Sequence, residues 1–175
     1  LAREPERAAA AFDGAEKDAD PRRAALARLG ALTTLVEQHR YAEADARMAD
    51  FARAHAELPE TALAQAWLAS FAGDHPGALE ILRVGEARFP SDPRLPTLAA
   101  HVHFLRDDRA AMQAALARAF ALAPDYHLAW YEQGLFHQFS EPDGAAAIAA
   151  FDRALDARAG FAPARMQRAQ VYYDL

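Results

Sequence analysis

The sequence contains no cysteine, and its serines are few. Without thiols the chain has no disulfide, no thiolate metal site and no cysteine nucleophile. Ser70, Ser91 and Ser140 are the only serines, and none has a histidine partner at a usable spacing. A glycine-rich phosphate loop and a G-x-S-x-G turn are also missing. Catalysis needs a nucleophile, a base and a stabilising group within mutual reach, so the sequence predicts no catalytic residue and no enzyme.

Long apolar runs and a surplus of basic residues are absent as well. No run approaches the roughly 20 apolar residues that span a bilayer. The net charge is −6, whereas a nucleic-acid binder normally presents a basic surface to phosphates. We therefore expect neither membrane insertion nor nucleic-acid binding.

The basic residues are almost all arginine, with Lys17 the only lysine. This bias is typical of a GC-rich bacterial genome, so we expect a bacterial, soluble protein. The first residues, Leu1 to Pro5, include neither an initiator methionine nor a signal peptide. The chain is therefore expected to be a piece of a longer protein, and the choice between cytoplasm and periplasm stays open.

The seven histidines raise the question of a metal site. His101 and His103 are the closest pair. Residues two apart on a helix point about 200° away from each other, so these two cannot readily chelate one ion. We predict no metal ion and no other cofactor.

The residues that are present favour helices. Alanine is the commonest residue and β-branched residues are sparse, and both features lower the entropy cost of a helix. Alternating or β-branched runs typical of strands are absent. The sequence therefore predicts an all-α fold.

Helices and turns recur at a fixed period. Two helical runs end at Pro90 and Pro124, which are 34 residues apart, and proline cannot continue a helix. Turns rich in polar residues and glycine end at positions 44, 78, 112 and 147, at spacings of 34, 34 and 35. The last turn is one residue longer than the others. Such a period indicates a stack of helix-turn-helix units, and it makes an irregular helical bundle a weaker alternative.

One copy of the unit carries most of a known signature, W-x2-L-G-x2-Y followed by A-x3-F. Trp130 and Gly134 stand at the Trp and Gly positions of the signature, Gln133 and His137 replace the Leu and the Tyr, and A-x3-F follows at residues 147–151. The sequence thus resembles the tetratricopeptide repeat (TPR) family. The resemblance implies a right-handed α-solenoid, in which hairpins stack because one hairpin cannot bury its apolar face alone.

The resemblance divides the chain into repeats that form a single array over residues 1–175. The leading repeat is partial and carries Ala8 and Phe12 as its A-x3-F pair. The spacing from Ala8 to Ala44 is 36, so the first junction is about two residues longer than the others. The predicted segments are 1–20 for the partial repeat, 25–58, 59–92, 93–126 and 127–161 for full repeats, and 162–175 for a lone terminal helix.

In this family the first helices of successive repeats line a concave groove, and the resemblance implies which residues face it. Trp67 and Ser70, like His101 and Phe104, lie three apart and are expected side by side. A carboxylate-gripping set of Lys and Asn, known in some family members, is missing at the corresponding positions. The implied groove residues are Leu63, Trp67, Ser70, Arg94, Thr97, His101, Phe104, Leu128, Tyr131, Leu135, Gln138, Met166, Gln170 and Tyr173.

Two functions from different classes are compatible with these features. The first is a protein-interaction scaffold that binds a peptide, a helix or a partner subunit in the groove. The alternative is an accessory substrate-recognition or dimerisation domain of a larger bacterial sulfotransferase, glycosyltransferase or oxygenase, whose catalytic half this chain lacks. Self-association through open solenoid ends, with Val171, Tyr172 and Leu175 at one end, is a further expectation.

Overall fold

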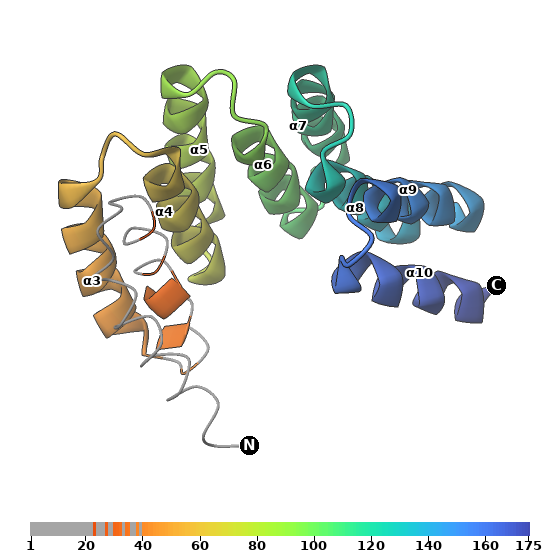
Figure 1. The fold of residues 1–175 in the computed structure, drawn as a ribbon, viewed down its shortest axis with the longest axis horizontal. Coiled ribbons are helices and arrows are strands. Elements are labelled where there is room, and N and C mark those ends of the chain that lie inside the picture. Colours follow the sequence, from red (N-terminus) through yellow and green to blue (C-terminus); the bar gives the residue numbers. More distant parts are fainter. Residues whose placement is uncertain (1–22, 24–26, 28–29, 33, 36–37, 39) are drawn as a thin grey trace. The chain divides into compact units, whose positions relative to one another are not determined.

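The computed structural model describes residues 23, 27, 30–32, 34, 35, 38 and 40–175 (Figure 1). The predicted partial repeat at residues 1–20 lies outside these residues. The chain divides into two compact units, residues 1–68 and 69–175. All regular structure in the described part is helical, so the predicted all-α fold is confirmed. The repeat boundaries within a single array remain a prediction.

The first unit contains α3 (Tyr41–Ala54) and most of α4 (Pro59–Phe71). Its core joins Met48 and Phe51 of α3 to Leu32 and Leu35. Trp67 packs against this cluster from α4. The helix α4 begins at a proline, whose fixed φ suits the first helical turn and whose missing N–H would have no partner there.

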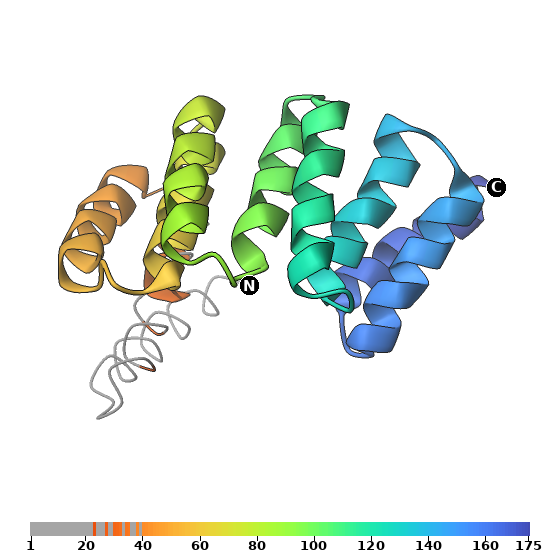
Figure 2. The same cartoon turned by 90° about the horizontal axis from the view of Figure 1, so that it is seen from above.

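The second unit is a series of helices joined by short turns (Figure 2). The helices α6 and α7 pack together, as do α8 and α9, and α10 packs on both α9 and α8. These packed neighbours are the helix-turn-helix pairs that the period predicts. The elements are α5 (His75–Arg88), α6 (Arg94–Leu105), α7 (Arg109–Leu122), α8 (His127–Leu135), the π-helical turn η1 (Phe136–Ser140), α9 (Gly144–Ala157) and α10 (Ala162–Asp174).

Aspartates cap the first turns of α5, α7 and α9. The carboxylates of Asp74, Asp108 and Asp143 accept hydrogen bonds from the backbone N–H three residues on, at 2.9, 3.2 and 3.0 Å. This is the usual N-cap arrangement, which satisfies a donor that the helix itself leaves unpaired. Asp108 and Asp143 therefore cap the helices α7 and α9.

Two of these turns use a residue with positive φ to end the preceding helix. Gly73 has φ 86° and Asp107 has φ 52°. In each case the next N–H bonds to a carbonyl five residues back, from Asp74 to Ala69 at 2.9 Å and from Asp108 to His103 at 3.0 Å. This is the pattern of a Schellman-type ending.

The helix before α9 ends in a different way, because the turn that follows it is one residue longer. The extra residue is taken up by η1, in which the N–H of Glu141 bonds to the carbonyl of Phe136 at 2.9 Å. One inserted residue rotates the following side chains by about 100° around the helix axis. The residues after Leu135 are therefore one position out of register with the earlier repeats.

One hydrophobic cluster in the core of the second unit contains Phe151. Its ring is fully buried among Leu135, Ala154 and Val171. Gly134 lets the ring come close, because a Cβ at that position would lie 2.3 Å from the Cε1 of Phe151. The signature glycine and the signature phenylalanine are thus two sides of one contact between α8 and α9.

Candidate functional site

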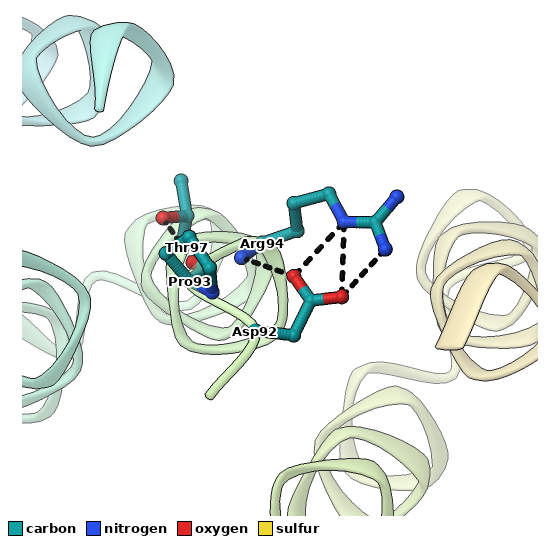
Figure 3. Close-up of polar contacts among 4 residues, drawn as sticks. All are labelled: Asp92, Pro93, Arg94 and Thr97. Atoms are coloured by element: carbon teal, nitrogen blue, oxygen red, sulfur yellow. Dashed lines mark hydrogen bonds and ion pairs between the residues drawn. The ribbon is translucent and has the colours of Figure 1, made fainter. Parts of the chain in front are cut away.

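At the start of α6, Arg94 and Thr97 are held within their own helix (Figure 3). The carboxylate of Asp92 accepts a hydrogen bond from the backbone N–H of Arg94 at 3.0 Å and from its Nε at 2.9 Å. The hydroxyl of Thr97 is buried and donates to the carbonyl of Pro93 at 2.7 Å. Thr97 is thus internal and offers little surface to a partner, whereas the charge-paired side chain of Arg94 is 33% exposed.

Further along α6, His101 forms a polar pair with α8. Its Nδ1 lies 3.1 and 3.2 Å from the two carboxylate oxygens of Glu132. Glu132 is only 7% exposed, so the carboxylate is nearly shut off from water. The hydrogen bond to Glu132 raises the pKa of His101 because it favours the charged imidazolium.

Three aromatic rings run from His101 towards η1. The ring centroids of His101 and Phe104 are 6.3 Å apart, and those of Phe104 and Phe139 are 6.2 Å apart. The expectation that His101 and Phe104 stand side by side is therefore confirmed. Phe139 is 55% exposed, although phenylalanine is among the residue types most often fully buried. We call His101, Phe104 and Phe139 the aromatic face.

Phe139 was not among the residues inferred from the sequence, which placed Gln138 there instead. The insertion in η1 explains the difference, since it moves the following side chains one position along. Gln138 lines a cavity of about 120 Å³ beside Val171 and Leu175 of the α10 end. The 35-residue spacing before Ala147 was the one sequence signal that could have indicated this shift.

The other inferred residues of α8 serve mainly to build the fold. Leu135 is buried in the core. The ring of Tyr131 lies 5.9 Å from that of Phe151 and 5.4 Å from that of Phe161. Burial raises the pKa of Tyr131. Leu128 is half-buried on the same helix.

On α10 the inferred residues lie on an exposed side. Met166 is 71% and Tyr173 is 87% exposed, and Gln170 between them donates to Asp174 at 2.8 Å. Helical spacing puts Met166, Gln170 and Tyr173 on one side of α10. They form an exposed patch with two large side chains.

The inferred residues of α4 are more enclosed. Trp67 and Leu63 are half-buried, and Trp67 packs on the core of the first unit. Ser70, near the end of α4, is buried. Trp67, like Tyr131, is therefore a poor place to test binding, because its removal would disturb packing.

Histidines in the described part of the chain do not gather around a common point. His103 lies on the other side of α6 from His101, with its Nδ1 3.7 Å from Asp108. Burial lowers the pKa of His103. Among the described residues, no group of three or more His, Asp or Glu side chains could hold a metal ion. No helix in that part of the chain is both long and apolar enough to cross a membrane.

The arrangement of paired helices is shared with solved structures of TPR proteins. TTC0263, a thermophilic TPR protein of Thermus thermophilus, matches with a TM-score of 0.74 and 17% identity, over 97% of this chain and 87% of that chain. The first TPR of Spaghetti (RPAP3), bound to an HSP90 peptide, matches with a TM-score of 0.58 and 19% identity, over 66% of this chain and 91% of that chain.

YrrB, described as a TPR protein with an unusual peptide-binding site, matches with a TM-score of 0.57 and 20% identity, over 94% of this chain and 84% of that chain. No protein-family model matches the sequence. No curated protein matches it either. At these identities the likeness establishes the fold, which is that of TPR proteins.

Proposed function

We propose that this chain is a protein-interaction module that binds a peptide or helix of a partner protein at the aromatic face. The observation that carries the proposal is the exposed ring of Phe139, which continues a row of rings from His101 and Phe104. Large aromatic side chains that remain exposed on a rigid scaffold are typical anchors of protein interfaces.

The surroundings support binding rather than catalysis. Phe104 packs against the buried core that contains Phe151, so the face is held by a rigid element. The residues on it offer apolar area and one polar pair, His101 with Glu132. Two of the structurally similar proteins are described with a bound peptide or a peptide-binding site. No feature of the described residues favours the accessory-domain alternative.

A binding test can use a displayed library of random peptides, panned on the whole chain. The affinity of a selected peptide is then measured by fluorescence anisotropy for the wild type and for Phe139→Ala. We expect at least a tenfold loss, which corresponds to about 1.4 kcal/mol for a central anchor. Phe139 is exposed, so its removal should leave the circular dichroism spectrum and the melting temperature almost unchanged.

A matched control separates this anchor from apolar surface in general. Leu122 of α7 is also an exposed large apolar residue, at 43%, and it lies outside the aromatic face. Leu122→Ala should bind the selected peptides with wild-type affinity. Equal losses in both variants, or no loss with Phe139→Ala, would remove the aromatic face from consideration as the binding surface.

A further inference from the structure

The pairing of His101 with Glu132 fixes the hydrogen position on the imidazole. An ionised carboxylate only accepts hydrogen bonds, and both oxygens of Glu132 lie within 3.2 Å of Nδ1. Nδ1 must therefore carry a hydrogen whether the ring is neutral or charged. It follows that Nε2 holds a lone pair in the neutral ring and a hydrogen in the charged ring.

The ring has a side that a partner can reach. The side chain of His101 is 37% exposed, whereas that of Glu132 is 10% exposed. The Nδ1 edge faces the buried carboxylate, and Nε2 is not among the buried side-chain nitrogens that lack a partner, so we infer that the exposed part of the ring includes Nε2. Phe104 lies beside it, and a partner that covers the aromatic face would therefore also cover this part of His101.

Apart from Glu132, the charged groups named for the neighbouring elements shift the pKa of His103 and not that of His101. Glu132 of α8 is the charged group that shifts the pKa of His101. Arg118 of α7, with Arg106 and Asp108 of the turn between α6 and α7, acts on His103 instead. The other histidine near this end of α8 is His137, whose Nε2 lies 2.9 Å from the amide nitrogen of Gln133. Glu132 is thus the charged group that raises the pKa of His101, and burial of the ring opposes this effect.

We propose that His101 is a proton-controlled selector on the aromatic face: its Nε2 donates a hydrogen bond to a backbone carbonyl of the bound peptide when the ring is charged, and cannot do so when it is neutral. The peptide places a large apolar side chain on Phe104 and Phe139 beside that carbonyl. A neutral carbonyl fits better than a carboxylate, because Glu132 already balances the imidazolium and would repel a second negative charge. This inference rests on the proposed function and adds its regulation.

The first test needs no ligand. Nitrogen-15 NMR of the histidine side chains, with His101 assigned by its absence in His101→Gln, reports the tautomer at a pH above the titration. We expect the Nδ1–H form in wild type and in Glu132→Gln, whose amide oxygen still accepts. The pKa of His101 should fall in Glu132→Gln, because the negative charge is gone. A neutral ring with its hydrogen on Nε2 would overturn the proposal.

The second test uses the library-selected peptides, restricted to sequences without Asp, Glu, His, Lys or Cys and with both ends capped. Affinity is measured at one pH below and one pH above the titration seen by NMR. We expect wild-type affinity to fall about fivefold or more on going to the higher pH, as for loss of one hydrogen bond to a charged donor. His101→Gln should show no such dependence.

The outcomes of this second test separate the two proposals. If Phe139→Ala abolishes binding at both pH values while the wild type shows no pH dependence, the selector is wrong and the binding face stands. If no selected peptide depends on Phe139, the binding face itself is wrong. If His101→Gln keeps the full pH dependence, another group is responsible and the selector is again wrong.

Discussion

Gly134 lies where the core leaves no room for a side chain. A Cβ there would meet Cε1 of Phe151 at 2.3 Å and Cδ1 at 2.5 Å, and this ring is fully buried. Alanine favours a helix over glycine by about 1 kcal/mol, but overpacking a core costs about 1–3 kcal/mol. We expect Gly134→Ala to lower the free energy of unfolding by up to about 2 kcal/mol, measured by urea denaturation.

Gly160→Ala is the control for that measurement. A Cβ at Gly160 meets nothing within 4 Å, and its φ is not in the positive range. The substitution should leave the free energy of unfolding unchanged or raise it slightly, because it restricts the unfolded chain. If Gly134→Ala lowered the free energy of unfolding no more than Gly160→Ala does, the close approach of Gly134 to Phe151 would be contradicted.

Asp107 and Gly73 fill equivalent places at two helix ends, and both have positive φ. Only glycine adopts this conformation without a steric penalty. We expect Asp107→Gly to raise the free energy of unfolding by about 0.5–1 kcal/mol and Gly73→Ala to lower it by about 1 kcal/mol. Thermal and urea unfolding of both variants would test these two predictions. A destabilised Asp107→Gly would contradict the argument that the positive φ of Asp107 costs stability.

At the scale of helices, the pair of His101 and Glu132 joins α6 to α8 and makes their packing depend on pH. The pKa of His101 is raised in the folded state, so the pair stabilises the fold below the unfolded pKa of about 6.5. This contribution is lost as the pH rises through the folded pKa. The ring is partly exposed, and solvent screening keeps the effect to about 1 kcal/mol at most.

The direction of this pH dependence can be tested by comparing wild type with His101→Gln. The difference in their free energies of unfolding should be largest near pH 5.5 and should shrink towards pH 9, on either side of the ordinary histidine pKa of about 6.5. The other titrating groups, including His103 with its lowered pKa, are present in both proteins and largely cancel. A difference that grew with pH would mean that His101 is neutral in the folded protein.

The same elements show what the sequence could and could not predict. The repeat and its helix caps were predictable because proline, glycine and aspartate act locally, within the few residues that form each turn. The aromatic face was predictable only in part. His101 and Phe104 follow from helical periodicity, whereas Phe139 depends on how an inserted residue is absorbed, which a one-residue change in spacing does not specify.

Contacts between helices could not be predicted from the sequence either, because they depend on which helices pack together. The pairing of His101 with Glu132 spans 31 residues, and Glu132 occupies a position that helical spacing alone would assign to either face. The burial of Thr97 and Leu135 likewise depends on which neighbours cover them. Family resemblance assigned these two to the groove, and the packing of the second unit encloses both.

For the whole molecule, the exposed side of α10 is the feature that bears on association between copies. Met166 and Tyr173 are 71% and 87% exposed, and neighbouring exposed apolar side chains of this size commonly mark an interaction surface. We expect the weight-average mass in sedimentation equilibrium to rise with concentration. A Met166→Glu, Tyr173→Glu double variant should stay monomeric, because burying two carboxylates against another copy is unfavourable.

Ala162→Glu is the control for added negative charge, since it places one of the two added charges at an exposed position at the start of α10, where the helix dipole favours an acidic residue. It should associate like the wild type. A wild-type chain that remained monomeric at all concentrations would show that the exposed side of α10 does not join copies. That result would leave this patch, like the aromatic face, as a candidate surface for a different protein, which the peptide selections can test with the same double variant.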